Sequence, residues 1–203
     1  AYGDNLTYRS NLSNVINIER THNTHALVNW TPTNDYVGNN TINFTVTDNS
    51  GLSDSQLVTI TVNNTNDAPI LGSIGTLNAY EDTLFTYDVN AVDIDTVDNL
   101  TFYDNTTLFN ITTSTGIINF TPTESDIGTH YVNITVEDNL NASYSEVITL
   151  IVSNTNDAPT LNPIANYSVL EDSTLSFNIT ASDPDLDYGD SLSYSSNISE
   201  VSI

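Results

Sequence analysis

The chain repeats itself with a fixed period. The hexapeptide Asn-Thr-Asn-Asp-Ala-Pro occurs at residues 64–69 and again at residues 154–159, 90 positions later. The register holds around both copies, because Thr-Pro-Thr at 31–33 returns at 121–123 and Glu-Asp at 81–82 returns at 171–172. A constant period of this length is typical of a tandem array of similar structural units. The two hexapeptides are predicted to be the joints of that array.

The composition limits the classes of partner. The 203 residues include 26 acidic residues but only two basic ones, Arg9 and Arg20, which gives a formal net charge of −24. This charge argues against nucleic acid and against anionic membrane surfaces as ligands. It favours bound cations or a high-salt setting, although acidity also keeps an ordinary surface protein soluble. With no cysteine, disulfides and thiol chemistry are excluded.

Alternating apolar and polar residues predict β-strands throughout. Ile42, Phe44 and Val46 alternate with polar residues, as do Val132, Ile134 and Val136, and this period of two places one face in a core and the other in water. Seven strands, lettered A to G, are predicted near 70–79, 83–91, 99–103, 107–112, 116–121, 129–137 and 144–153. The expected fold class is all-β, in tandem seven-strand immunoglobulin-like Greek-key β-sandwiches.

The period divides the chain into one complete unit and two incomplete ones. Residues 68–157 form a complete repeat, residues 1–67 supply strands C to G of the preceding one, and residues 158–203 supply strands A to D of the next. Residues 1–8 resemble residues 187–194, so the head and the tail overlap within the unit. We expect either a window from a longer array, which is the simpler explanation, or strand complementation in which one chain's tail completes the next chain's head. A filament is compatible with both. No apolar run is long enough for membrane insertion within this window, and no signal peptide is evident.

Many acidic residues lie in turns at the two ends of the predicted sandwiches. In such a fold the B–C and F–G turns lie near the incoming linker, and the A–B and E–F turns lie near the outgoing one. Carboxylates gathered there repel each other unless a cation binds them, and Ca²⁺ takes 6–8 oxygen ligands. The absence of cysteine and of clustered histidine argues against zinc, copper or iron. The predicted Ca²⁺ ligands are Asn64, Asn66, Asp67, Asp93, Asp95 and Asp138 at the first joint, and Glu81, Asp82, Glu124, Asp126, Asn154, Asn156, Asp157, Asp183 and Asp185 at the second. The alternative is that these residues only cap turns and solvate loops.

These motifs resemble those of cadherin repeats. The linker at 64–69 is similar to the cadherin interdomain signature Asp-x-Asn-Asp followed by proline, but its first residue is Asn64 and it is one residue shorter before the proline. Asp93-Ile94-Asp95 resembles the family's Asp-x-Asp turn, while Glu81 and Asp138 resemble its A–B and F–G acids. The E–F Asp-Arg-Glu motif is missing. The whole pattern is closer to bacterial and archaeal cadherin-like surface repeats than to animal cadherins. The resemblance implies calcium at each joint, stiffening an extracellular rod used in adhesion.

Glycosylation sequons are dense. The chain contains fifteen Asn-x-Ser/Thr triplets, and in many of them the middle residue is apolar and should point inward, sending Asn and Thr to solvent together. The alternative is chance, in a protein rich in Asn and Thr. The acceptors are Asn5, Asn11, Asn29, Asn39, Asn43, Asn63, Asn99, Asn105, Asn110, Asn119, Asn133, Asn141, Asn166, Asn178 and Asn197.

Catalysis is not expected. His22, His25 and His130 show no partner pattern, and no nucleophile elbow is present. The sequence predicts a calcium-stiffened structural or adhesive repeat region at the cell surface, whose partners are other surface proteins or copies of itself, with N-linked glycans. Two alternatives stay open. One is a spacer or carbohydrate-binding region of a secreted glycoside hydrolase, for which Tyr131, Tyr144 and Tyr167 are the candidate sugar contacts. The other is a glycosylated surface sheath without ordered metal.

Overall fold

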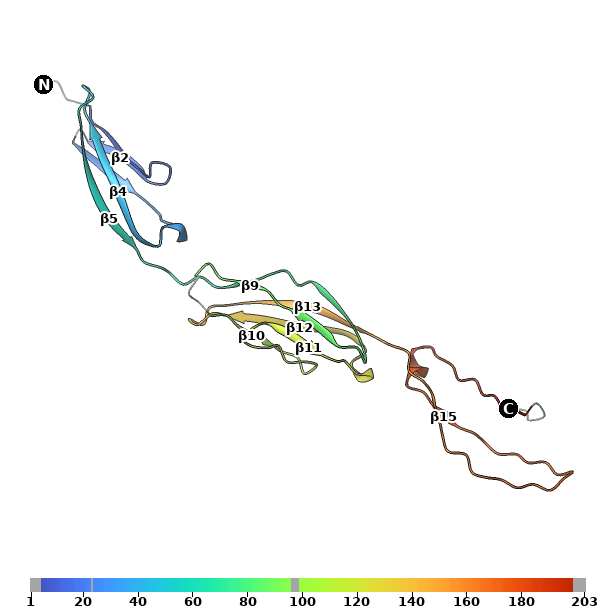
Figure 1. Ribbon diagram of the computed structural model, residues 1–203. Helices are drawn as coiled ribbons and strands as arrows, with labels where there is room; N and C mark the ends of the chain where they lie inside the picture. Colours follow the sequence, from blue (N-terminus) through green and yellow to red (C-terminus); the bar gives the residue numbers. More distant parts are fainter. Residues whose placement is uncertain (1–4, 23, 96–98, 199–203) are drawn as a thin grey trace. The chain divides into compact units, whose positions relative to one another are not determined.

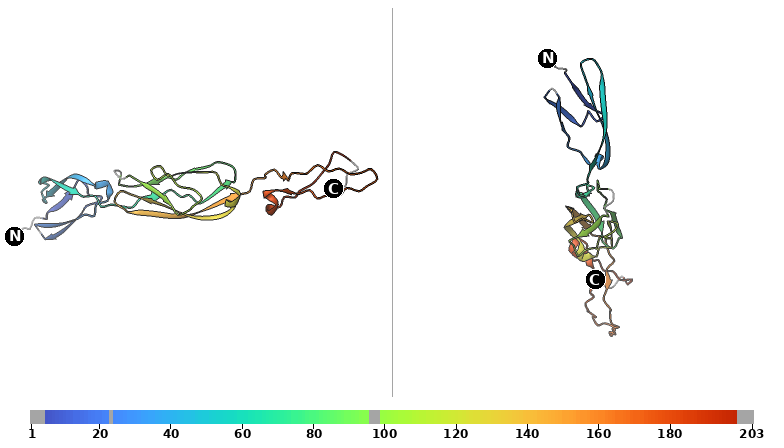
Figure 2. Two further views of the ribbon diagram at one scale, coloured as in Figure 1. Left: turned by 90° about the horizontal axis from the view of Figure 1, so that it is seen from below. Right: turned by 90° about the vertical axis from the view of Figure 1, so that its left-hand side faces the viewer.

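The computed structural model describes residues 5–22, 24–95 and 99–198, and it divides into two compact units, residues 1–67 and residues 68–203 (Figures 1 and 2). Both units are built from β-strands, as predicted, and the only helical elements in the described residues are short 3₁₀ turns. Residues 1–4, where the resemblance between the head and the tail begins, lie outside the described residues.

The second unit contains a complete β-sandwich. One sheet has the strand order β10-β12-β13-β7, and the opposite side is formed by the pairs β8–β11 and β6–β9. Strands β12 and β13 form a long antiparallel hairpin, from Gly128↔Val152 to Glu137↔Ser143. The elements are β6 (Ile70–Leu71), β7 (Thr76–Tyr80), β8 (Phe85–Asp88), β9 (Ala91–Val92), β10 (Thr101–Asp104), β11 (Ile117–Phe120), η2 (Glu124–Asp126), β12 (Gly128–Glu137) and β13 (Ser143–Ser153).

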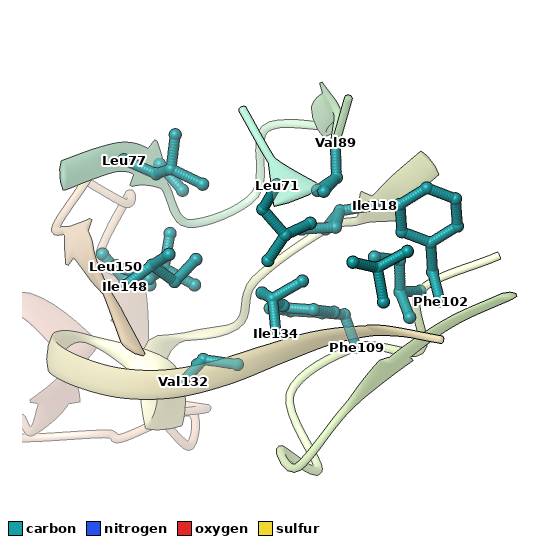
Figure 3. Packing of buried hydrophobic residues seen from close by; sticks show 14 residues of the cluster. Leu71, Leu77, Val89, Phe102, Phe109, Ile118, Val132, Ile134, Ile148 and Leu150 are labelled. Atoms are coloured by element: carbon teal, nitrogen blue, oxygen red, sulfur yellow. The ribbon is translucent and has the colours of Figure 1, made fainter. Parts of the chain in front are cut away.

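The core of this sandwich follows the predicted alternation. Val132, Ile134 and Val136 on β12 are each no more than 1% exposed, while the residues between them face outward in part. In Figure 3, Leu71 and Val89 lie on one side of the interior, and Val132 and Ile134 lie on the other. Burial of side chains of this size stabilises the fold by about 1.5–3 kcal/mol each.

The predicted strand over residues 107–112 is wrong. No strand is present there. Instead Asp104 closes a loop, because its carboxylate accepts hydrogen bonds from the backbone N–H groups of Thr106 (3.1 Å) and Ile111 (2.8 Å). Phe109 and Ile111 are still buried in the core. A turn follows, and at Gly116 (φ 73°) a Cβ would lie 2.5 Å from the carbonyl oxygen of Val89, so only glycine fits there.

The predicted first strand, 70–79, is split between the two sheets. Its first part, β6, pairs with β9 in antiparallel fashion, and its second part, β7, pairs in parallel with β13. Gly75, with φ 72°, lies in the crossing between them. The first and last strands of the repeat are therefore hydrogen-bonded neighbours.

The first unit is an incomplete sandwich. One sheet has the order β1-β4-β5 and the other is the pair β2–β3. Among its described residues the buried hydrophobic side chains are Ile16 and Ile42 alone, so this core is far less covered than that of the complete repeat. The elements are β1 (Thr7–Ser10), β2 (Asn17–His22), β3 (His25–Asn29), η1 (Asn34–Tyr36), β4 (Gly38–Thr47) and β5 (Ser53–Val62).

The segment after the second hexapeptide is sparsely structured. In its described part it holds β14 (Thr160–Leu161), β15 (Ala181–Ser182) and η3 (Pro184–Tyr188). Its apolar side chains, from Leu161 to Ile198, are largely exposed. Across the described residues, no helical segment has the length and hydropathy of a membrane span.

Candidate metal centre

The second joint is tied to the complete repeat through Glu81. This residue follows β7 and is 1% exposed. Its Oε1 accepts a hydrogen bond from the backbone N–H of Thr155 (2.9 Å), and its carbonyl oxygen accepts one from the Thr155 hydroxyl (3.3 Å). Its backbone N–H donates to the carbonyl of Ser153 (3.1 Å). Because β7 and β13 run in parallel, the A–B turn and the outgoing linker leave the sheet side by side.

The next repeat contributes an acidic turn to the same joint. Oδ1 of Asp183 accepts a hydrogen bond from the backbone N–H of Asp185 (2.9 Å), which caps η3. Oδ2 of Asp185 accepts a hydrogen bond from the backbone N–H of Asp157 in the linker. Asp183 is 8% exposed and Asp185 only 2%. The linker is thus held by a carboxylate on each side, Glu81 before it and Asp185 after it.

Several oxygen atoms of this joint are buried but accept no hydrogen bond. They are Oδ1 of Asn154, Oδ2 of Asp183 and Oδ1 of Asp185. One carboxylate oxygen from each of Asp183, Asp185 and Asp190 lies within 4.8 Å of the others. Leaving such groups unsatisfied is unfavourable, and more so for charged ones. A hard cation such as Ca²⁺ would satisfy them, so the donor set fits that ion.

The electrostatics of the joint also indicate crowded negative charge. Desolvation, together with the carboxylates of Glu81, Asp185, Asp157 and Asp187, raises the pKa of Glu124 above its ordinary value of 4.5. Glu124 lies in η2, the predicted E–F turn. The turns predicted to converge at the second joint therefore influence one another.

Other predicted ligands of this joint have local roles. Oδ2 of Asp126 accepts hydrogen bonds from the backbone N–H and the hydroxyl of Thr123 (both 2.8 Å), and these bonds lower the pKa of Asp126. Asp82 is exposed with φ 54°, like Asp172 (φ 64°) one period later, and its N–H donates to the carbonyl of Pro122. The exposed Asn156 donates from Nδ2 to the carbonyl of Asp157 (3.0 Å). The contacts of Asp126 agree with the turn-capping alternative.

The first joint falls at the division between the two units, so its halves are described separately. On the second unit, Asp93 repeats the geometry of Asp183, because its Oδ1 accepts the backbone N–H of Asp95 (2.8 Å) while its Oδ2 is buried without a hydrogen bond. Asp95 is 7% exposed. Asp138 is 3% exposed, and its Oδ1 accepts the N–H groups of Leu140 and Ala142, as in an ordinary turn.

On the first unit, the linker is held by an amide. Nδ2 of Asn34 in η1 donates to Oδ2 of Asp67 (2.8 Å). Glu124 is the corresponding residue one period later, so this half carries less negative charge than its counterpart. Asn64 is exposed, and Asn66 is partly buried.

Three residues of the second joint were not predicted: Asp190, Thr155 and Asp187. A sequence signal for Asp190 existed, since Asp-Ser-Leu-Ser at 190–193 repeats Asp-Asn-Leu-Thr at 4–7 and at 98–101. Thr155 binds Glu81 mainly through its backbone N–H, and a backbone contact of this kind cannot be predicted from the residue type.

The predicted glycan acceptors are accessible for the most part. All are exposed except Asn43 and Asn133, which are partly buried on β4 and β12. Asn11 and Asn105 are equivalent, and each accepts a backbone N–H through Oδ1, from Asn43 (3.0 Å) and Asn133 (2.8 Å). A glycan attaches to Nδ2, so these bonds do not block modification.

Comparisons with known proteins agree with this fold. Residues 1–61 match the family described as "Bacterial Ig domain". The structure resembles a protocadherin γB7 EC3-6 cis-dimer (TM-score 0.56, 13% identity, 88% of this chain and 52% of that one) and a protocadherin γB4 extracellular domain (0.55, 16%, 89% and 35%). It also resembles mouse cadherin-23 EC22-24 (0.52, 14%, 74% and 53%). No curated protein matches in sequence.

The chain thus spans about half or less of the structures it resembles. At these identities the likeness concerns the fold. The fold is that of cadherin-like, immunoglobulin-like β-sandwich repeats.

Proposed function

We propose that this chain is an extracellular structural or adhesive repeat region whose joints are stiffened by Ca²⁺. The observation that supports this most is the set of buried oxygens without hydrogen bonds at the second joint, on Asn154, Asp183 and Asp185. Asp183 and Asp185 each have a carboxylate oxygen within 4.8 Å of one on Asp190, and Glu81 and Asp185 accept hydrogen bonds from the linker that carries Asn154. The buried oxygens without hydrogen bonds come from the outgoing linker and from the following repeat, so an ion bound by them would connect consecutive units.

Ca²⁺ fits this site better than other ions. The available donors are carboxylate and amide oxygens, and the described residues offer no histidine or cysteine cluster for zinc. Desolvation and the neighbouring carboxylates raise the pKa of Glu124, and a divalent charge would offset the repulsion from those carboxylates. Asn154, Asp183, Asp185 and Asp190 would be the inner ligands, and Glu81, Glu124 and Asp157 would complete or surround them.

Calcium titration by calorimetry tests the binding. The full chain should bind Ca²⁺ with a Kd on the order of 10⁻⁴ to 10⁻³ M, the range of extracellular modules. Asp185→Asn should weaken the second joint at least about tenfold, since it removes a charge from an inner ligand. Asp54→Asn is the matched control, because this exposed β5 residue lies outside both joints. Absence of binding would contradict the proposal and favour a sheath without ordered metal.

Small-angle scattering tests the stiffening separately. Removing calcium with a chelator should change the maximum dimension of the full chain and broaden its distance distribution, because the linkers lose their cross-connections. Magnesium at equal ionic strength controls for screening by salt. An unchanged distribution would leave calcium binding without a mechanical role.

The structure does not favour carbohydrate binding. Tyr131 pairs with Thr149 on the outer face of its sheet, while Tyr144 pairs with the buried Val136 and so belongs to the inner face. Tyr167 lies in the C-terminal segment. These three tyrosines do not form one row on one sheet, as a sugar platform would require.

N-linked glycans are part of the proposal. Thirteen of the fifteen acceptor asparagines are exposed in the structure. Intact mass measured before and after enzymatic deglycosylation of protein from its native source tests this. An unchanged mass would mean that the sequons arise from the Asn- and Thr-rich composition.

A further inference from the structure

Two exposed tyrosines lie on the outer face of the four-stranded sheet of the complete repeat. Tyr103 on β10 is 43% exposed, and Tyr131 on β12 is 73% exposed. Tyr103 pairs with Thr135 across the two strands. Because residues two apart on a strand face the same side, Tyr131, Asn133 and Thr135 share this outer face. Asn133, one of the predicted glycan acceptors, therefore lies among the tyrosines.

Both rings are within reach of the Asn133 side chain. Tyr131 is its neighbour along β12, and Tyr103 is its diagonal neighbour on β10. Diagonal neighbours are about 7–8 Å apart, a distance that an aromatic side chain spans. Nδ2 of Asn133 donates a hydrogen bond to Oγ1 of Thr135 (3.3 Å), the residue that pairs with Tyr103. The atom that would carry a sugar thus has a tyrosine on either side.

The pattern Tyr-x-Asn-x-Thr is rare among the sequons of this chain. Of the fifteen acceptors, only Asn105 and Asn133 follow a tyrosine by two residues. These two asparagines are also neighbours in space, because Oδ1 of Asn105 accepts the backbone N–H of Asn133 (2.8 Å). Both copies of the pattern therefore meet at one place on the sheet.

The preceding unit has the same acceptor without the tyrosines. Asn43 is the equivalent of Asn133, and it follows Thr41 instead of a tyrosine. On the neighbouring strand, Arg9 pairs with Thr45 where the complete repeat has a tyrosine. The rings are therefore specific to the surroundings of Asn133 and are not a requirement of the repeat fold.

This face carries little charge for so acidic a chain. The outward positions of β12 and β13 hold mainly Thr, Ser, Asn and apolar residues, and the one acid among them is Glu137, where the hairpin turns. A neutral pyranose suits such a face. Its C–H groups would cover part of a tyrosine ring, which removes apolar surface from water, while its hydroxyl groups stay solvated.

We propose that the N-glycan of Asn133 packs its first pyranose against Tyr103 and Tyr131 and thereby stabilises the complete repeat. This inference rests on the N-glycosylation in the proposed function. In the attachment, C1 of the sugar replaces one hydrogen of Nδ2, and the phosphate of an activated glycosyl donor leaves. The contact forms within one molecule, so it covers the two rings and requires no platform for free carbohydrate.

Thermal melting of the full chain, prepared with and without N-glycans, tests this packing. In the glycosylated protein, Tyr103→Thr and Tyr131→Thr should each lower the melting temperature by roughly 2–8 °C, the shift that an ordinary aromatic contact gives in a domain of this size. Threonine keeps the preference for a β-strand. In the unglycosylated protein the same substitutions should have a much smaller effect, because both rings are exposed there.

Two further variants control for other causes. Thr135→Ala abolishes the sequon and keeps Asn133, so in that background the tyrosine substitutions should lose their extra effect. Tyr144→Thr is the matched ring control, because Tyr144 is 45% exposed but belongs to the inner face of the sheet. Its effect should be equal with and without glycans. Mass spectrometry of glycopeptides identifies the preparations in which Asn133 is occupied.

The outcomes separate this inference from the proposed function. It is overturned if Asn133 carries no glycan while other acceptors do, or if both tyrosine substitutions cost the same with and without glycans. An effect of only one tyrosine supports it and identifies the ring that the sugar covers. A chain without glycans at any acceptor overturns it together with the glycan part of the proposed function, whereas calcium binding at the joints is measured independently.

Discussion

The backbone N–H of Thr155 donates a 2.9 Å hydrogen bond to Oε1 of Glu81, 74 residues earlier in the chain. This bond connects the linker that leaves the complete repeat to the turn after β7. Since Glu81 is almost fully buried, its charge lies in the joint rather than in bulk solvent.

Glu81→Ala and Glu81→Gln should therefore behave differently. Alanine removes the carboxylate that accepts the Thr155 N–H, and a hydrogen bond to a charged group contributes about 1.5–3 kcal/mol to the free energy of unfolding. Glutamine keeps an oxygen acceptor but removes the charge, so in chelator it should lose less stability than alanine does while still weakening calcium binding. Urea unfolding with and without calcium checks both variants. Equal losses for the two would mean that Thr155 does not depend on this acceptor.

Glu124 should make the stability of the calcium-free protein depend on pH. Its folded pKa is raised above 4.5, so ionisation disfavours the folded state. Its contribution to stability is lost as the pH rises from 4.5 through the folded pKa. In chelator, Glu124→Gln should raise the melting temperature at pH values above the folded pKa of Glu124. At pH values below 4.5 the substitution should leave the melting temperature unchanged. In calcium, the gain should shrink or reverse. A pH-independent effect would show that the surrounding carboxylates do not act on Glu124.

Asp126 should have the opposite pH dependence. Its folded pKa is lowered below 3.8 by the hydrogen bonds from Thr123, so its contribution is present above 3.8 and is lost as the pH falls through the folded pKa. Asp126→Ala should cost about 1 kcal/mol at neutral pH, as expected for a lost cap. In thermal melts, the difference in melting temperature between Asp126→Ala and the wild type should decrease as the pH falls from neutral to acidic. A constant difference would point to packing instead.

The core prediction is independent of the joints. Ile134→Ala removes a fully buried side chain and should cost about 2–5 kcal/mol, through lost burial and a cavity. Val147→Ala on the neighbouring strand is the control, because Val147 is 65% exposed and should change stability by less than about 0.5 kcal/mol. Similar losses at both positions would contradict the assigned faces of the hairpin.

The periodic parts of this fold could be predicted from sequence. The alternation of Val132, Ile134 and Val136 sets the inner face of β12, and the repeated hexapeptides mark the joints. The segment from 107 to 112 could not be predicted in this way. It has strand-like residues, but Asp104 bonds to the backbone of Ile111 and closes a loop instead. A hydrogen bond from a side chain to a distant backbone group leaves no periodic signal.

The candidate site was predictable to a similar degree. Topology alone brings the turns of Glu81 and Glu124 to the outgoing linker, together with Asp185 of the next repeat. The role of each predicted ligand depends on local geometry that the sequence does not reveal. The carboxylate of Asp126, for example, caps η2. Asp190 enters because η3 turns the chain back toward Asp185, where the N–H of Asp190 donates to the carbonyl of Asp185 (3.2 Å).

A crystal structure of the full chain grown in millimolar Ca²⁺, with an anomalous difference map, tests the central claim most directly. We predict a peak at the second joint, with oxygens of Asn154, Asp183, Asp185 and Asp190 about 2.3–2.6 Å away. An ordered joint with these side chains turned into solvent, and no peak between them, would contradict the account.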